Sequence, residues 1–202
     1  MAANTELTPM KRQYNEIKEK NQDCILFFRL GDFYEMFDED ARVAAKELDL
    51  TLTTRDRNKP KEEQTPMCGV PYHSVDAYIA RLVQKGYKVA ICEQMEDPAQ
   101  AKGIVERDIT RIVTPGTVTE SCMLDETKNN YMACLYGEGS KFGLAFCDVS
   151  TGAFFVTVCA DAQAAASELG RFSPAEGLRG GMDVDCTILN EALFHRLSCC
   201  VD

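Results

Sequence analysis

Apolar positions at the start of the chain predict a helix followed by a buried strand. Thr8 and Pro9 are typical of a helix start, because threonine is a favoured N-cap and proline suits the first helical position. Apolar residues then recur at helical spacing at Met10, Tyr14 and Ile17. The run Cys24–Leu30 is apolar at nearly every position, which predicts a central strand covered on both faces.

The next apolar pattern predicts a helix that begins at Asp32. Its buried side is formed by Phe37, Ala41, Ala44 and Leu48, which lie three or four residues apart. Asp32 and Glu35 have the spacing of a capping box, in which the first side chain caps the helix and the second reaches back to a free backbone N–H.

The remaining pattern up to residue 117 alternates strands with helices, which indicates an α/β layer. Leu50–Thr54 is predicted as a second strand, and residues 55–66 as a polar loop. Ser74 is predicted to cap an amphipathic helix that ends at Gly86, with an apolar face formed by Val75, Tyr78, Ile79, Leu82 and Val83. Two further strands are predicted at Tyr87–Gln94 and Arg107–Thr117, the second running into a Pro-Gly turn.

The pattern changes after about residue 118 and predicts a second unit. A polar connection, residues 120–130, precedes three strands joined by glycine-containing turns between residues 131 and 160. A helix is predicted over Ala162–Phe172 and a short segment near Thr187–Leu189. Three strands and one helix form a thin core, so we expect this unit to be incomplete and the chain to be part of a longer protein.

Composition narrows the class of protein. The N-terminus is too polar for a signal peptide and no stretch resembles a transmembrane helix, so we expect a soluble cytoplasmic protein with no membrane partner. None of the ten cysteines is spaced as C-x-x-C, and several, such as Cys24, Cys92 and Cys147, lie within apolar runs. This indicates small buried residues in a reducing compartment rather than disulfides or a zinc site. The net charge of −10 argues against nonspecific polyanion binding, although a local basic patch can still hold a large anion.

Phe33 and Glu35 admit two interpretations. In the first, Glu35 caps the predicted helix and Phe33 folds over its first turn. In the second, Phe33 projects beyond the helix end, where a helix N-terminus also favours phosphate. An apolar wedge between base steps in the minor groove unstacks and kinks a duplex, and a carboxylate two residues away could bond the exposed base edge.

Three long stretches resemble the N-terminal part of the MutS family of DNA mismatch-repair proteins. They read FFRLGDFYEMFDEDARVAAKELDLTLTTRD, TPMCGVPYHSVDAYIARLVQKGYKVAICEQMEDP and VERDITRIVTPGT, in the order of the family, and cover nearly all of residues 8–120. Residues 130–202 resemble the beginning of that family's connector domain, which has an RNase H-like fold. The predicted fold class is therefore α/β: a mixed-sheet mismatch-recognition domain over residues 1–120, then an incomplete RNase H-like connector domain over residues 128–202.

The resemblance implies a DNA-binding module rather than an enzyme. Phe33-Tyr34-Glu35 matches the family's Phe-x-Glu motif, so Phe33 would stack on a mispaired or unpaired base and Glu35 would hydrogen-bond it. The implied partners are mismatched double-stranded DNA, a second copy in a full-length homodimer, and downstream repair proteins that the connector would bind. No G-x-x-x-x-G-K-[ST] loop occurs, so no cofactor is expected in this chain; ATP and Mg²⁺ are expected for the longer protein, whose ATPase would lie towards its C-terminus.

Further candidate DNA contacts are less specific in sequence. Arg55, Arg57, Lys59 and Lys61 form a basic run that is either a solvated loop or a set of phosphate contacts. In the family, the loop that corresponds to Met67, Gly69, Pro71 and Tyr72 approaches the DNA backbone. Arg107 and Arg111 are expected on one face of a strand, where they contact backbone or pair with Glu106 and Asp108.

Two other function classes remain open from the residues. Asp148 occupies the place where RNase H-type nucleases hold a metal-binding acid, but two-metal chemistry needs several converging carboxylates, so a structural role is favoured over a metal-dependent nuclease. The second unit could also be a pure protein-interaction module. His73 has no visible catalytic partner and is interpreted as structural, and His195 lies in the incomplete region.

Overall fold

The computed structural model describes residues 7–55, 60, 64–99, 101 and 103–180. The chain divides into two compact units, Met1–Val113 and Thr114–Asp202, and each is described by itself. Both are mixed α/β units, which confirms the predicted fold class. The predicted segment Thr187–Leu189 and His195 lie outside the described residues.

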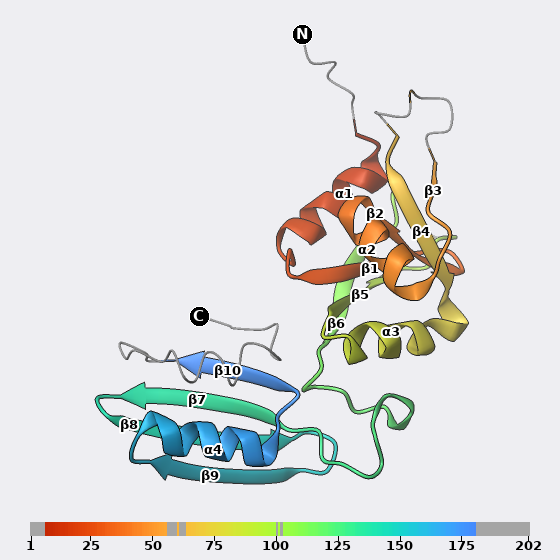
Figure 1. Cartoon of the computed structure of the whole chain (residues 1–202). Coiled ribbons are helices and arrows are strands. Elements are labelled where there is room, and N and C mark those ends of the chain that lie inside the picture. Colours follow the sequence, from red (N-terminus) through yellow and green to blue (C-terminus); the bar gives the residue numbers. More distant parts are fainter. Residues whose placement is uncertain (1–6, 56–59, 61–63, 100, 102, 181–202) are drawn as a thin grey trace. The chain divides into compact units, whose positions relative to one another are not determined.

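The first unit is a six-stranded mixed sheet with helices on both faces (Figure 1). The strand order is β3-β4-β2-β1-β5-β6; β1 and β5 are parallel neighbours, and the other pairs are antiparallel. The strands are β1 (Cys24–Leu30), β2 (Phe33–Phe37), β3 (Thr53–Thr54), β4 (Pro66–Pro71), β5 (Lys88–Gln94) and β6 (Arg107–Val113). The helices are α1 (Pro9–Glu19), α2 (Asp38–Leu48) and α3 (Val75–Gln84), with a short 3-10 turn, η2 (Tyr72–Ser74), before α3.

β1 has the central position that its apolar run predicted. Its first five residues are buried, because successive side chains point to opposite faces and both faces are covered. On one face, Tyr14 of α1 packs edge-on against Phe28 and Phe37, with ring centroids 5.4 and 4.9 Å away. The core on this side consists of Tyr14, Cys24, Leu26, Phe28, Phe37, Ala90 and Cys92. On the opposite face, β2 and β4 pack against α2, where Ala41, Ala44 and Leu48 are buried.

The predicted helix start at Asp32 is wrong, because residues 33–37 form a strand. Gly31 and Asp32 are the two-residue turn of a β1–β2 hairpin in which Leu30 pairs with Phe33. From Phe33 to Met36 the side chains alternate between more exposed and buried, which is the period of a strand and not of a helix. The helix begins only at Asp38 and ends at Leu48, so the proposed capping box of Asp32 and Glu35 does not exist.

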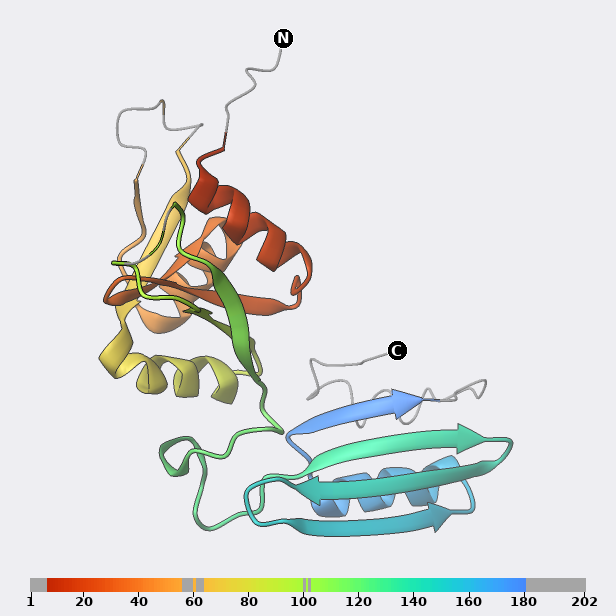
Figure 2. The same ribbon diagram turned by 180° about the vertical axis from the view of Figure 1, so that it is seen from behind.

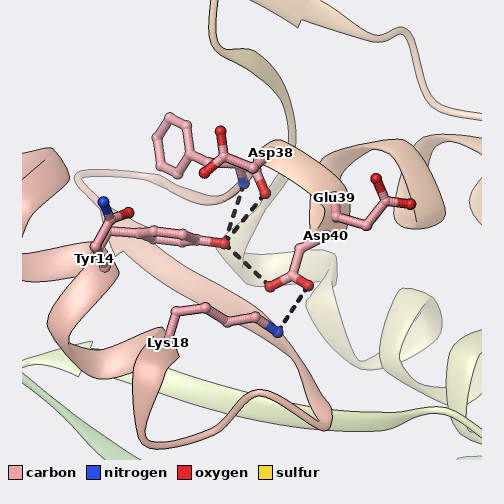
Figure 3. A pocket seen from close by; sticks show the side chains of 7 residues that line it. Tyr14, Lys18, Asp38, Glu39 and Asp40 are labelled. Carbon is pink, nitrogen blue, oxygen red and sulfur yellow. Dashed lines mark hydrogen bonds and ion pairs between the residues drawn. The ribbon is translucent and has the colours of Figure 1, made fainter. Parts of the chain in front are cut away.

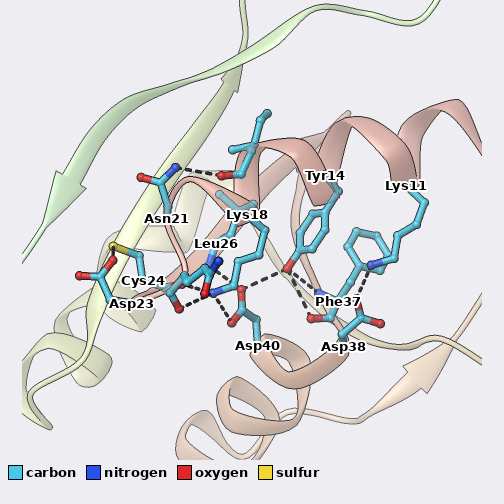
Figure 4. A network of polar contacts seen from close by, with 12 residues as sticks. Lys11, Tyr14, Lys18, Asn21, Asp23, Cys24, Leu26, Phe37, Asp38 and Asp40 are labelled. Atoms are coloured by element: carbon cyan, nitrogen blue, oxygen red, sulfur yellow. Dashed lines mark hydrogen bonds and ion pairs between the residues drawn. The ribbon is translucent and has the colours of Figure 1, made fainter.

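Asp40, in the first turn of α2, joins this helix to β1 and α1 through its side chain. Its buried carboxylate accepts hydrogen bonds from the Leu26 backbone N–H at 3.0 Å and the Tyr14 hydroxyl at 3.1 Å. Lys18 forms an ion pair with it at 2.9 Å (Figure 3). Burial, together with the negative charge of Asp40, raises the pKa of Tyr14 far above its ordinary value. The same polar network continues along α1 to Lys11, which pairs with Asp38 (Figure 4).

Other local predictions have mixed outcomes. Thr8 caps α1 as predicted, accepting from Lys11 N with Pro9 at the first helical position. Ser74 precedes α3 as predicted, but its hydroxyl donates to the Pro71 carbonyl and does not cap the helix. The predicted strand Leu50–Thr54 shrinks to Thr53–Thr54, because the Leu50 N–H completes the end of α2 by bonding the Ala45 carbonyl.

The segment predicted as a family loop is mostly β4. Met67, Gly69 and Pro71 lie on this strand, which pairs with β2, and Tyr72 lies beyond it in η2. Its Met-Cys-Gly-Val-Pro sequence is short and bounded by prolines, so its composition does not suggest a strand.

The second unit is a four-stranded sheet covered on one face by a helix (Figures 1 and 2). The strand order is β10-β7-β8-β9, with β10 parallel to β7 and the other pairs antiparallel. The elements are β7 (Met132–Glu138), β8 (Lys141–Asp148), β9 (Ala153–Cys159), α4 (Ala162–Phe172) and β10 (Glu176–Gly180). The three predicted strands and the helix are confirmed, while β10 was not predicted.

The described cysteines are free, and most are buried, as their apolar surroundings predicted. Cys24, Cys68, Cys92 and Cys159 are buried, Cys147 is intermediate and Cys134 is exposed. Burial raises the pKa of the Cys24 and Cys68 thiols to about 11, so both are protonated and unreactive at neutral pH. No helix in the described part of the chain is long and apolar enough to cross a membrane.

Candidate nucleic-acid interface

Phe33 lies at the tip of the β1–β2 hairpin with its ring open to solvent. Gly31 has a φ of +59°, the left-handed conformation that glycine supplies at the first position of a tight hairpin turn. The turn is held from the other side, since the Tyr72 backbone N–H donates to the Asp32 carbonyl at 2.9 Å. Phe33 begins β2 directly after this turn and is 48% exposed. The hairpin, and not a helix end, therefore projects the ring away from the core.

Glu35 lies two residues further along β2, on the same face as Phe33. It pairs across the strands with Gly69, where an added Cβ would stand 3.3 Å from the Tyr34 carbonyl oxygen and 3.5 Å from Glu35 Cγ. Gly69 therefore leaves room for the Glu35 side chain against the sheet. The carboxylate forms an ion pair with Arg55, whose Nη2 lies 2.8 Å from Oε1.

The second carboxylate oxygen of Glu35 has no hydrogen-bond partner in the described part of the chain, although it is buried. Buried acceptors are nearly always bonded, because an unsatisfied one loses its hydration and gains nothing in return. Glu35 Oε2 is an exception of this kind, and it lies two residues from the exposed ring of Phe33.

The register of β2 against β4 brings several predicted residues onto one face. Phe33, Glu35 and Phe37 pair with Pro71, Gly69 and Met67 respectively, and paired residues share a face of the sheet. Met67 also packs against the core beneath α1, so it supports this face more than it projects from it. We call the cluster formed by Phe33, Glu35, Arg55 and Gly69 the hairpin site; Phe33 and Arg55 are exposed in it, and Glu35 and Gly69 are partly buried.

Arg29 supports the hairpin from the opposite face and was not among the predicted site residues. Its guanidinium lies 3.9 Å from the ring centroid of Tyr72, and its Nε donates to the Gly31 carbonyl within the turn. An ion pair of 3.6 Å joins it to Glu93, which also accepts from the Tyr34 hydroxyl. Burial, followed by the bond to Glu93, raises the pKa of Tyr34 to about 12. The sequence signal was present: a single arginine in an otherwise apolar strand, two residues before the turn.

Tyr72 therefore lies on the far side of the hairpin from Glu35, with 44% of its surface exposed. Its ring is stacked on Arg29 and its backbone anchors the turn. These contacts give Tyr72 a role in holding the hairpin.

Arg107 is part of the interior of the first unit. Its guanidinium donates to the Arg29 carbonyl at 2.7 Å, to Gln13 Oε1 at 3.0 Å and to the Val105 carbonyl at 2.8 Å. It also lies over the Phe28 ring, and burial lowers its pKa from the ordinary arginine value. Because Arg107 is buried and these contacts use three of its five N–H donors, it is not included in the hairpin site.

The expectation that Arg107 and Arg111 share a face is wrong. A β-bulge shifts the register between Ile91 and Cys92, so that Thr110 is the extra residue. Arg107 pairs with Gln94, whereas Arg111 pairs with Ile91, and these partners point to opposite faces.

Other predicted basic residues are only partly described. Arg57, Lys59 and Lys61 lie outside the described residues, so Arg55 alone represents the basic run. His73 is exposed in η2, with its ring edge-on to Tyr72.

Asp148 is a structural residue of the second unit. Its buried carboxylate accepts five hydrogen bonds, from the backbone of Asn130, Ser150 and Thr151 and from the side chains of Asn129 and Ser150. Burial alone would raise its pKa, but these donors outweigh burial and hold the pKa well below its ordinary value. No group of metal-ligating side chains is found among the described residues.

Comparison with known proteins defines the class of the two units. The model of MutS domain I matches residues 8–122, and the model of MutS domain II matches residues 130–181. The chain belongs to the MutS family. It is 58% identical over 186 residues to the DNA mismatch repair protein MutS of Clostridium tetani, covering 92% of this chain and 21% of that protein. The MutS protein of Acetivibrio thermocellus is 58% identical over 192 residues, which cover 94% of this chain and 21% of that protein. The MutS protein of Ruminiclostridium cellulolyticum is 63% identical over 151 residues, which cover 75% of this chain and 17% of that protein. The chain thus spans about a fifth of the length of these curated relatives.

Proposed function

We propose that this chain recognises mismatched or unpaired bases in duplex DNA through the hairpin site. The observation that carries the proposal is the exposed ring of Phe33 on a braced two-residue hairpin, with the partly unsatisfied carboxylate of Glu35 on the same face. An apolar side chain presented in this way can enter the minor groove and separate a base step. The relatives, which are named for DNA mismatch repair, support this assignment.

Selectivity follows from the cost of unstacking. A mispaired base stacks poorly on its neighbours, so separating it costs less than separating a matched pair. The ring of Phe33 then stacks on the faulty base, and Glu35 takes a hydrogen bond from its exposed edge. Only this last contact depends on base chemistry, so the site responds mainly to how easily a step deforms.

The longer protein supplies the remaining activities in this proposal. Because the chain spans about a fifth of its relatives, we place the ATPase, with its ATP and Mg²⁺, and the homodimer contacts elsewhere in a full-length cytoplasmic protein. The chain itself holds no cofactor, and the second unit acts as a connector that other repair proteins bind.

The decisive experiment replaces Phe33 by alanine in the full-length protein and compares binding to a G·T duplex and a matched duplex. Stacking of a base on an aromatic ring is worth about 1–3 kcal/mol, so we expect mismatch selectivity to fall roughly 5- to 150-fold. Because the ring is half exposed, the fold should not change. Phe154→Ala removes an even more exposed ring from the second unit and should leave selectivity unaltered. Unchanged selectivity in Phe33→Ala would refute the wedge.

A further inference from the structure

Arg55 and Glu35 form an ion pair in which one side chain is much more exposed to solvent than the other. The Glu35 side chain is only 13% exposed, whereas that of Arg55 is 48% exposed. A single guanidinium nitrogen of Arg55 reaches Glu35 Oε1, at 2.8 Å. An incoming anion can therefore reach the guanidinium without first displacing the protein around the carboxylate.

In this ion pair, the Glu35 carboxylate cannot hydrogen-bond a base. Its Oε2 is buried against the sheet and lacks a hydrogen-bond partner in the described chain, while Oε1 is occupied by Arg55. Neither oxygen is available to a base edge until the side chain moves. Burying Oε2 without a hydrogen bond costs free energy, and the ion pair of Oε1 with Arg55 offsets that cost.

We infer that Arg55 is a positioning residue that stores Glu35 in the free protein and releases it by transferring to a DNA phosphate. This inference rests on the proposed function of the hairpin site. A guanidinium can bind either a carboxylate or a phosphate, because its N–H donors match the spacing of the oxygens in both groups. Once Arg55 has moved, Glu35 is left without its partner and turns to the base that Phe33 has opened.

The exchange gives the hairpin site an order of events. A duplex that approaches the free protein meets a neutral pair instead of a bare carboxylate, which would repel it. Contact with the backbone, which carries no sequence information, then frees the one group that contacts a base. Glu35 can therefore contact a base only after Arg55 has bound the DNA backbone.

The exchange also predicts how Glu35 changes the effect of Arg55→Ala on DNA affinity. When Glu35 is present, Arg55 must leave a favourable pair before it can bind phosphate, so part of its contribution to DNA affinity is lost. When position 35 carries alanine instead, Arg55 has no such pair to break. Arg55→Ala should therefore weaken DNA binding less in the protein that retains Glu35 than in the Glu35→Ala background.

The test is a double-mutant cycle in the full-length protein, with G·T duplex affinities of wild type, Glu35→Ala, Arg55→Ala and the double variant. Partly exposed ion pairs couple weakly, so we expect the two effects of Arg55→Ala on Kd to differ by about two- to fivefold in the stated direction. Equal effects, or a larger effect with Glu35 present, would show that Arg55 does not leave Glu35 in the complex and would overturn the inference.

Two further measurements separate the exchange from a purely structural role. Arg55→Ala should reduce the slope of log Kd against log salt by about 0.9, as expected for one lost phosphate contact, whereas Arg55→Lys should keep the slope. In the unfolding of the free protein, Arg55→Ala and Glu35→Ala should be non-additive; additive effects would mean that no pair stores Glu35, and would also overturn the inference.

The matched control is Arg42→Ala, which removes an exposed arginine from a surface pair with Glu39 on α2. Its effect on Kd should be the same whether or not Glu35→Ala is also present. Failure of the exchange is distinguishable from failure of the proposed function, because Phe33→Ala reports on the wedge alone. A cycle without coupling, together with lost selectivity in Phe33→Ala, would reject the exchange and retain the wedge.

Discussion

Arg29 shows how single residues fix the hairpin site. Its carbonyl accepts from Arg107, its guanidinium stacks on Tyr72, and its Nε bonds the turn at Gly31. Arg29 thus ties the turn that precedes Phe33 to two other elements, β6 and η2, through its side chain and its backbone carbonyl. The wedge that we propose has to be held firmly to separate a base step, and these contacts hold the turn that carries it.

Asp148 is the polar residue of the second unit that accepts five hydrogen bonds, so its substitution tests that network. Asp148→Asn replaces one acceptor oxygen by a donor that faces the existing donors, so at least two of its hydrogen bonds are lost. We expect a loss of roughly 3 kcal/mol in the free energy of unfolding, measured by urea denaturation. Asp161→Asn is the control in the same unit: it caps α4 by accepting from Ala164 N, and asparagine caps as well as aspartate, so little change is expected.

The same substitution should change how stability depends on pH. Because the folded pKa of Asp148 lies below its unfolded value, its stabilisation is complete above the ordinary carboxyl pKa of about 4 and is lost as the pH falls below that value. In the Asp148→Asn variant, the free energy of unfolding should therefore fall less steeply as the pH decreases below about 4. An unchanged dependence on pH would contradict the hydrogen bonds assigned to Asp148.

At the scale of elements, the β1–β2 hairpin depends on the backbone conformation of Gly31. An added Cβ at Gly31 would meet nothing within 4 Å, so Gly31→Ala tests the conformation alone. We expect a cost of about 1 kcal/mol in unfolding free energy, because a φ of +59° is unfavourable for residues with a side chain. Gly103→Ala also meets no neighbour and carries no positive φ, so it should be close to neutral. Equal effects of the two would argue against the tight turn.

Much of the fold follows from the sequence, and the failures have specific causes. The spacing of Ala41, Ala44 and Leu48 was correctly interpreted as helical, but it was extended back through residues whose true period is two. Gly31-Asp32 between two apolar runs is a local hairpin signal, but it was interpreted as a helix start. The second pairing partner of those residues, β4, is short and bounded by prolines, so its composition did not indicate a strand. The bulge at Thr110 likewise depends on its pairing with β5.

The candidate site was predictable as a set of residues but not as a geometry. The Phe-x-Glu motif singled out Phe33 and Glu35, and both lie on one face of the hairpin site. The helical explanation for their exposure was wrong, because a hairpin turn projects Phe33. The pair of Glu35 with Arg55 and the brace by Arg29 arise from contacts between elements, which residue spacing does not encode.

At the scale of the whole molecule, the net charge limits how the proposed DNA binding can arise. The chain carries 32 acidic and 22 basic residues, so it does not attract a polyanion over long distances. In the proposed function, binding by this chain therefore has to come from local contacts, in which a stacking ring contributes more than net charge. Such contacts favour a mismatched step, which is easier to deform, over matched DNA.

The most direct test of the central claim places a photoreactive benzoyl-phenylalanine at position 33 of the full-length protein. On irradiation with a G·T duplex, we predict crosslinks at the mismatched pair and its immediate neighbours, and few crosslinks at any position of a matched duplex. The same group at the exposed position Tyr136 of the second unit should give no preference for the mismatch. Crosslinks from position 33 spread equally along both duplexes, or none at the mismatch, would contradict the claim that this ring enters DNA where pairing is faulty.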